Sequence, residues 1–175
     1  MTVYEFVLRF AVGGADTDPA QFFEALAEAG CTDALVGVGR MGVIGLDFAR
    51  ASQSAEEALG SAIASVKRAI PGSVLIEASP DLVGLTELAE ILGFSRQYMR
   101  TLASTHHTTF PAPVHQGRPS LWHLATVLEW VESVACRAVD PMMAEVARVT
   151  MSLNAAVGER SADDDAIIRS RALIA

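Results

Sequence analysis

Five residues between Ser95 and Arg100 carry side-chain chemistry that can recognise nucleic acid. An arginine fork donates two hydrogen bonds to the edge of guanine, and a glutamine amide pairs in a similar way with adenine, so Arg96 and Gln97 are candidate base contacts. If this stretch is helical, Arg100 lies one turn beyond Arg96 on the same face, and Tyr98 comes within reach of phosphates. Ser95 is a residue type that caps the N-terminus of such a helix.

The charge around these residues differs from that of the rest of the chain. The protein has a formal net charge of −8, yet Asp and Glu are absent between Ile91 and Leu128. Because salt screens charges beyond roughly 8–10 Å, phosphates respond to the local field and not to the total charge. The window therefore predicts a local basic patch, whose members are Arg96, Arg100, Arg118, His106, His107, His115 and His123.

The apolar spacing indicates which elements must position this patch. It predicts a helix from Leu85 to Leu92, a turn at Gly93 and a second short helix over residues 95–102, with Met99 and Leu102 on its buried side. Prolines exclude a helix in the following stretch and favour a small β-wing. A closing helix is expected over 124–131. The residues expected near phosphates outside the second helix are Arg118, His106, His107 and His115.

The order of these landmarks resembles a known domain. The stretch DLVGLTELAEILGFSRQYMR is followed by FPAPV, Gly117 and SLWHLATVLEWV. This pattern resembles the winged helix-turn-helix of the excisionase and AlpA branch of the MerR-like superfamily, over about residues 81–131. The resemblance implies a DNA-binding domain with Arg118 in the wing and a recognition helix that carries Ser95, Arg96, Gln97 and Arg100.

The N-terminal half follows a different pattern. Alternating apolar residues predict strands, Asp18 with Pro19 opens one helix, and Ser54 with Glu57 forms a capping box that opens another. The resulting order, β-α-β-β-α-β, is that of ferredoxin-like sandwiches. We therefore expect an α+β chain with a ferredoxin-like domain over residues 1–79 and a winged helix-turn-helix over residues 80–138. The first domain would sense a small molecule or bind a partner protein.

Residues 139–175 are expected to form a helical extension that makes the chain a homodimer. Its apolar residues recur at spacings of 4, 3 and 4, which suits pairing with a partner helix. The predicted dimerisation residues are Met142, Val146, Val149 and Leu153. A last helix is expected after Ser161, because its charges complement a helix dipole. These charges are Asp163, Asp164, Asp165, Arg169 and Arg171.

Other chemistries have weaker support. The string GVGRMG (residues 37–42) fits a dinucleotide-binding pattern, but a strand follows it where that motif needs a helix. The histidines and Cys136 lack the paired spacing of a structural zinc site, and no catalytic constellation is recognisable. We therefore expect no metal, no cofactor and no enzymatic activity.

The sequence also predicts a cytoplasmic location. Cys31 and Cys136 lie far apart, as free thiols of a reducing compartment do. The first residues, MTVYEF, lack the features of a signal peptide, and no apolar run is long enough to span a bilayer.

We expect a sequence-specific DNA-binding transcriptional regulator that docks residues 95–102 in the major groove of double-stranded DNA, as a dimer. The alternative is a protein-interaction, adaptor or antitoxin-type protein whose helix-turn-helix is weak or degenerate. The small number of cations favours this alternative.

Overall fold

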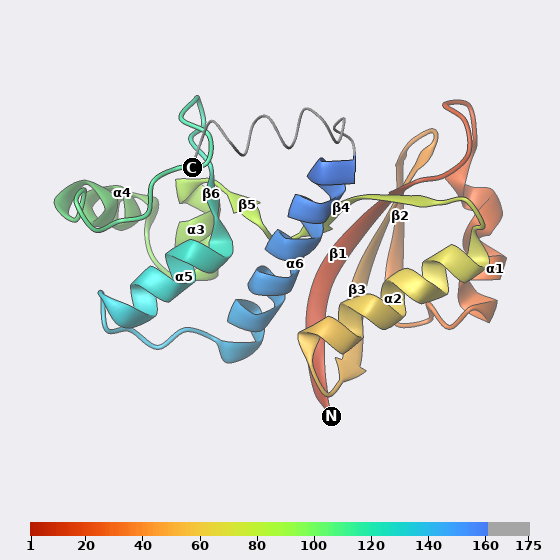
Figure 1. Ribbon diagram of the computed structural model, residues 1–175, viewed down its shortest axis with the longest axis horizontal. Coiled ribbons are helices and arrows are strands. Elements are labelled where there is room, and N and C mark those ends of the chain that lie inside the picture. The colour runs from red at the N-terminus through yellow and green to blue at the C-terminus, as the bar shows by residue number, and fades with distance from the viewer. Residues whose placement is uncertain (161–175) are drawn as a thin grey trace.

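The computed structural model describes residues 1–160 and has an α+β fold, as predicted (Figure 1). Its larger sheet is antiparallel throughout and has the strand order β2-β3-β1-β4. The strands are β1 (Thr2–Ala11), β2 (Ala34–Arg40), β3 (Val43–Ser52) and β4 (Val74–Ser79). A two-residue turn, Met41–Gly42, joins β2 to β3, and Gly42 has a positive φ of 74°, which glycine adopts without strain. The glycines of GVGRMG thus belong to a hairpin.

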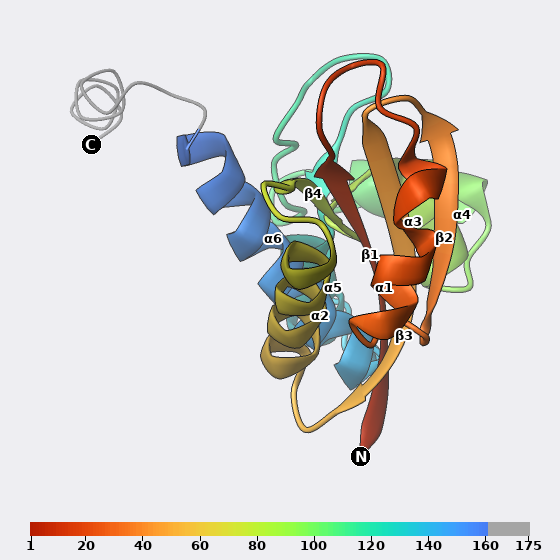
Figure 2. The same ribbon diagram turned by 90° about the vertical axis from the view of Figure 1, so that its right-hand side faces the viewer.

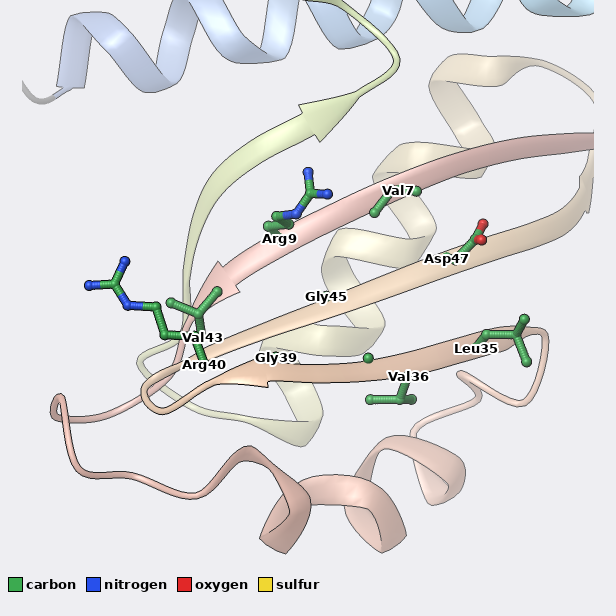
Figure 3. A pocket seen from close by; sticks show the side chains of 10 residues that line it. Val7, Arg9, Leu35, Val36, Gly39, Arg40, Val43, Gly45 and Asp47 are labelled. Atoms are coloured by element: carbon green, nitrogen blue, oxygen red, sulfur yellow. The ribbon is translucent and has the colours of Figure 1, made fainter.

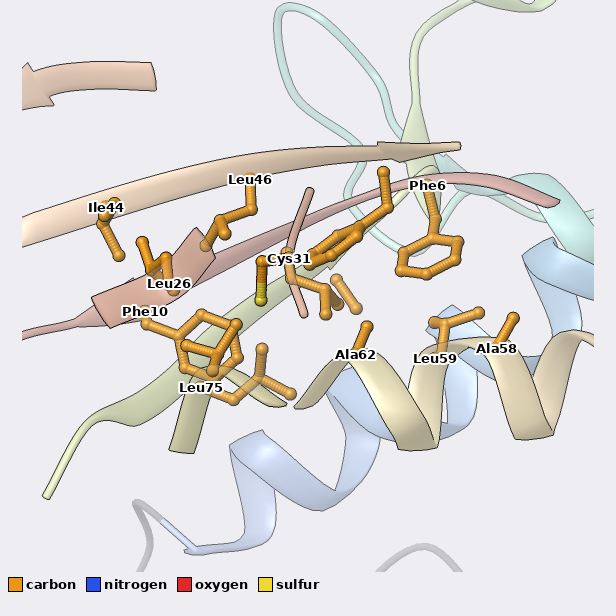
Figure 4. Packing of buried hydrophobic residues seen from close by; sticks show 14 of the residues in the cluster. Phe6, Phe10, Leu26, Cys31, Ile44, Leu46, Ala58, Leu59, Ala62 and Leu75 are labelled. Atoms are coloured by element: carbon orange, nitrogen blue, oxygen red, sulfur yellow. The ribbon is translucent and has the colours of Figure 1, made fainter. Parts of the chain in front are cut away.

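One face of this sheet carries the first hydrophobic core, and helices cover it (Figures 1 and 2). The covering elements are the 3₁₀ turn η1 (Pro19–Phe22), α1 (Phe23–Glu28) and α2 (Ala55–Ala69). Both predicted N-caps are present: the Asp18 carboxylate accepts a hydrogen bond from the Ala20 amide at 2.9 Å, and the Ser54 hydroxyl accepts one from the Glu57 amide at 3.2 Å. The capping box differs from the prediction in its second bond, because the Glu57 carboxylate accepts from the Gln53 amide, at 3.2 Å, and not from that of Ser54. Figure 4 shows the packing of this core, which includes Phe6, Phe10, Leu26, Leu46 and Leu59.

A second, smaller core lies in the C-terminal half. Its elements are β5 (Leu82–Val83), α3 (Leu85–Ile91), α4 (Arg96–Thr105), β6 (Trp122–His123) and α5 (Leu124–Ser133). Strands β5 and β6 pair antiparallel, and the Leu124 amide at the start of α5 donates to the Asp81 carbonyl just before β5 at 2.7 Å. The largest fully buried side chains here are Leu88, Met99, Leu124 and Leu128.

Helix α6 (Pro141–Arg160) packs between the two cores (Figure 1). Val146 belongs to the first core and Ala147 to the second. The prediction that Met142, Val146, Val149 and Leu153 form a dimer contact is corrected by their positions. Val146, Val149 and Leu153 pack against the chain's own sheet core, and only Met142 of the four is exposed. Neither α6 nor any other helix within residues 1–160 is long and apolar enough to cross a membrane. The helix expected after Ser161 lies outside the described residues.

Candidate nucleic-acid interface

The turn between α3 and α4 is closed by backbone hydrogen bonds. The Phe94 amide donates to the Ala89 carbonyl at 2.7 Å, and the Gly93 amide donates to the Glu90 carbonyl at 3.2 Å. This pair of bonds is the Schellman pattern of a helix end, in which the residue after the C-cap has a left-handed backbone. Gly93 has a φ of 67°, which a glycine adopts without strain. The turn predicted at Gly93 is therefore confirmed.

Helix α4 has one anchored side and one exposed side. The Ser95 hydroxyl accepts a hydrogen bond from the Tyr98 amide at 3.1 Å, which confirms the predicted N-cap. Met99 is fully buried, as expected. Arg96, Gln97 and Arg100 are exposed. The helix thus presents two guanidinium groups and one amide to solvent from a fixed backbone.

An additional cation, Arg137, lies beside the first turn of α4 and was not among the residues predicted from the sequence. Its guanidinium stacks over the rings of Phe94 and Tyr98, at 4.9 Å and 5.8 Å from their centroids. These two rings themselves meet edge-on at 4.9 Å. Because Arg137 follows α5, only the tertiary fold brings it here. It adds positive charge next to the Tyr98 side chain, which is 40% exposed.

The segment expected to form a wing is a hairpin-like loop with one isolated β-bridge, His115 to Leu121. The Val114 amide donates to the Leu121 carbonyl at 2.8 Å, and the Leu121 amide donates to the His115 carbonyl at 3.0 Å. Arg118 lies in the loop between them and is exposed. The base of the loop is held by Trp122, whose indole N–H donates to the Pro111 carbonyl at 2.9 Å. Arg118 is therefore one more exposed cation, and it comes from a separate element.

A groove of about 440 Å³ lies between the start of α3, helix α4 and the base of this loop. Arg96 and Arg100 line one wall, and Pro119 to Trp122 line the other. The floor includes Thr86 and also Glu87. No ion pair within residues 1–160 joins Glu87 to either arginine. Residues 91–128 contain no Asp or Glu, but the fold brings Glu87, from outside that stretch, into the groove beside Arg96 and Arg100.

The four histidines have different environments, so the predicted grouping is revised. His107 and His115 are exposed. The ring of His106 packs edge-on against Trp130, with 5.4 Å between the ring centroids, and so takes part in the second core. His123 Nδ1 lies 2.6 Å from an oxygen of the buried Asp81 carboxylate. His106 and His123 are therefore close in sequence to the arginines of the predicted basic patch, but their rings contact other parts of the chain.

A second depression, of about 500 Å³, lies on the sheet face opposite the helices (Figure 3). Gly37 and Gly45 face each other across β2 and β3 and form its floor. Arg9, Arg40 and Asp47 stand around it. Arg9 forms an ion pair with Glu77 at 2.9 Å. Within residues 1–160, no group of three metal-ligating side chains is found.

Comparison of the chain with protein-family models, with curated proteins and with solved structures found no match.

Proposed function

We propose that the protein is a sequence-specific DNA-binding transcriptional regulator that docks α4 in the major groove. The observation that carries this proposal is the two-sided character of α4. Met99 is fully buried and holds the helix, while Arg96, Gln97 and Arg100 are exposed on it. A recognition helix needs this arrangement, because base edges are read by side chains whose backbone is fixed.

The surrounding elements support a winged helix-turn-helix of the excisionase and AlpA type. The order of α3, tight turn, α4, hairpin-like loop and α5 is the order of that domain. The loop would be the wing. Likewise, the element order β-α-β-β-α-β and the strand order β2-β3-β1-β4 support a ferredoxin-like N-terminal domain.

Phosphate contacts would come from both sides of the groove next to α4. Arg118 in the wing and Arg137 beside Tyr98 are exposed cations from two other segments of the chain. The Thr86 hydroxyl lines the groove and can donate to a phosphate oxygen. Together these groups would orient α4, while Arg96 and Gln97 would discriminate bases.

Glu87 favours the alternative function, an adaptor or antitoxin-type protein with a degenerate helix-turn-helix. Its carboxylate lines the groove that phosphates would enter, and it would repel them. In this case α4 would contact a protein, and the exposed Arg96 and Arg100 would pair with acidic side chains.

The test is selection of DNA from a random library, followed by binding measurements with single variants. Arg96→Ala should weaken binding to the selected site by roughly 5- to 150-fold, because one bidentate base contact contributes about 1–3 kcal/mol. Arg148→Ala, which removes an exposed arginine of α6, is the matched control and should bind as the wild type does. Circular dichroism should show unchanged folding for both variants. Failure to enrich any sequence, or equal affinity of Arg96→Ala and Arg148→Ala, would contradict the proposal.

A further inference from the structure

The two outer strands of the larger sheet have different surroundings. Strand β4 is covered by α6: the Asn154 side chain accepts from the Ala78 amide at 2.8 Å and donates to the Ala78 carbonyl at 2.7 Å. Near the end of the same helix, the Arg160 guanidinium donates to the Leu75 carbonyl at 2.7 Å. These bonds occupy the Ala78 amide and carbonyl and the Leu75 carbonyl, so α6 obstructs the addition of another strand at this edge.

Strand β2 forms the opposite edge of the larger sheet, and no helix of residues 1–160 bonds to its backbone as α6 does to that of β4. Its sheet partner is β3. In residues 1–160, the other backbone hydrogen bond at this strand is local: the Ala34 amide donates to the Cys31 carbonyl where the chain enters β2. No side chain of that part of the chain bonds to the β2 backbone as Asn154 does to β4. A row of backbone donors and acceptors therefore faces solvent along β2.

The side chains of β2 do not protect this edge. Exposed edge strands commonly carry lysine, proline or an inward-pointing charge, which prevents pairing with another chain. The β2 sequence, ALVGVGR, has no lysine or proline, and its one charge, Arg40, is at the end of the strand. The only irregularity of its pairing with β3 among the described residues is a register shift between Gly37 and Arg40, so Ala34–Gly37 form a regular edge. Leu35 is 78% exposed, a large fraction for an apolar side chain. An apolar, unpaired edge of this kind is a template for strand addition.

Charge selects the orientation of an added strand. Figure 3 shows Arg40 at one end of β2 and Asp47 at the other end, next to Leu35. Asp47 is the cross-strand neighbour of Leu35, and neither Asp47 nor Arg40 has an ion-pair partner among the described residues. The other nearby carboxylate, Asp33, is already bound by the Arg50 guanidinium at 2.8 Å, and this hydrogen bond lowers the pKa of Asp33.

A second copy of the same strand fits this pattern. If two β2 strands pair antiparallel, Arg40 of each copy points toward the Leu35 and Asp47 end of the other. A parallel pair would bring the two Arg40 side chains together. Gly37 and Gly45 leave the sheet face bare beside the edge, which gives the partner's Leu35 room to lie there. We propose that the chain is a homodimer in which the β2 edges of two copies pair antiparallel and form one continuous sheet.

The symmetry of this contact limits it to two copies. An isologous contact uses the same patch on both subunits, so it closes and leaves nothing for a third chain. The opposite edge is capped by α6, which prevents further growth of the sheet. This interface does not involve α4, so the dimer can form whether or not the chain binds DNA.

The mass of the full chain in sedimentation equilibrium tests the interface. The wild type should be dimeric at micromolar concentration. Leu35→Lys should be monomeric, because it places a charge on the edge and satisfies Asp47 within the same copy. The matched control is Ile76→Lys, at an equally apolar position of β4 that is 41% exposed, and it should stay dimeric. A monomeric wild type, a dimeric Leu35→Lys, or dissociation of both variants would overturn the proposal.

A charge reversal provides an independent measurement. Arg40→Asp and Asp47→Arg should each raise the dimer dissociation constant by about tenfold or more, because each leaves two like-charged contacts in the pair. The double variant should restore the wild-type constant within about threefold, since both attractive contacts reform with opposite polarity. Additive weakening in the double variant would rule out the antiparallel pairing, because Arg40 and Asp47 would then not meet across the interface.

Discussion

Ser95 and Met99 perform different tasks in α4, although they are only one turn apart. Ser95 satisfies a backbone amide at the start of the helix, and Met99 anchors the helix in the second core. Neither task requires contact with DNA. In the proposed function the base contacts come from Arg96 and Gln97, which are exposed and lie outside the core. Stability and recognition should therefore be separable by single substitutions in this helix.

The Ser95 cap offers such a separation. Ser95→Ala should lower the free energy of unfolding by about 1 kcal/mol, because the Tyr98 amide loses its acceptor. Ser95→Asp should retain the stability, since aspartate caps equally well, but should weaken DNA affinity by about tenfold through repulsion of nearby phosphates. Chemical denaturation and titration of labelled DNA measure the two effects. Wild-type DNA affinity in Ser95→Asp would mean that the start of α4 does not approach phosphates.

At the scale of elements, the helix pair could be predicted because its signals are local. A glycine at the turn and a serine at the cap are read directly from the sequence, and both have the expected roles in the structure. The contacts of α6 could not be predicted in this way. Apolar spacing indicates that Val146, Val149 and Leu153 are buried, but it does not indicate which surface buries them. In the structure, these three side chains are buried against the chain's own sheet.

The polar residues of α6 explain why it packs within the chain. Glu145 accepts a hydrogen bond from the Tyr4 hydroxyl at 3.0 Å and another from the Ala55 amide, at the N-terminus of α2, at 2.9 Å. Asn154 bonds to β4 and also donates to the Asp81 carboxylate at 2.8 Å. These bonds join positions far apart in the sequence, so no local sequence pattern predicts them. They fix the register of α6 across both cores.

Asn154 is the residue through which this junction can be tested. Asn154→Ala should lower the free energy of unfolding by about 1–3 kcal/mol, because the Ala78 amide and carbonyl lose their partner in a partly buried place. Ser152→Ala, two residues away on the exposed side of α6, should change it by less than about 0.5 kcal/mol. Urea unfolding of both variants provides the comparison. Equal stabilities would show that α6 is held by its apolar contacts alone.

At the scale of the whole molecule, the exposed cations of the proposed interface come from three segments that the second core brings together. Arg96 and Arg100 belong to α4, Arg118 to the loop before β6, and Arg137 to the segment after α5. The chain as a whole has a net charge of −8, so surfaces outside this patch repel DNA. With so few cations in each copy, the proposed DNA binding would gain affinity from two copies on one site, and the proposed β2 interface would supply the second copy.

The salt dependence of binding tests this combination. If two copies contact roughly six phosphates, log K should fall with log salt with a slope near −5, because each contact releases condensed counterions. Leu35→Lys, if monomeric, should bind more weakly and with a slope of about half that value, whereas Ile76→Lys should retain the wild-type slope. Fluorescence anisotropy at several salt concentrations gives the slopes. A wild-type slope in monomeric Leu35→Lys would mean that one copy makes all the phosphate contacts, and the dimer would then serve another purpose than DNA affinity.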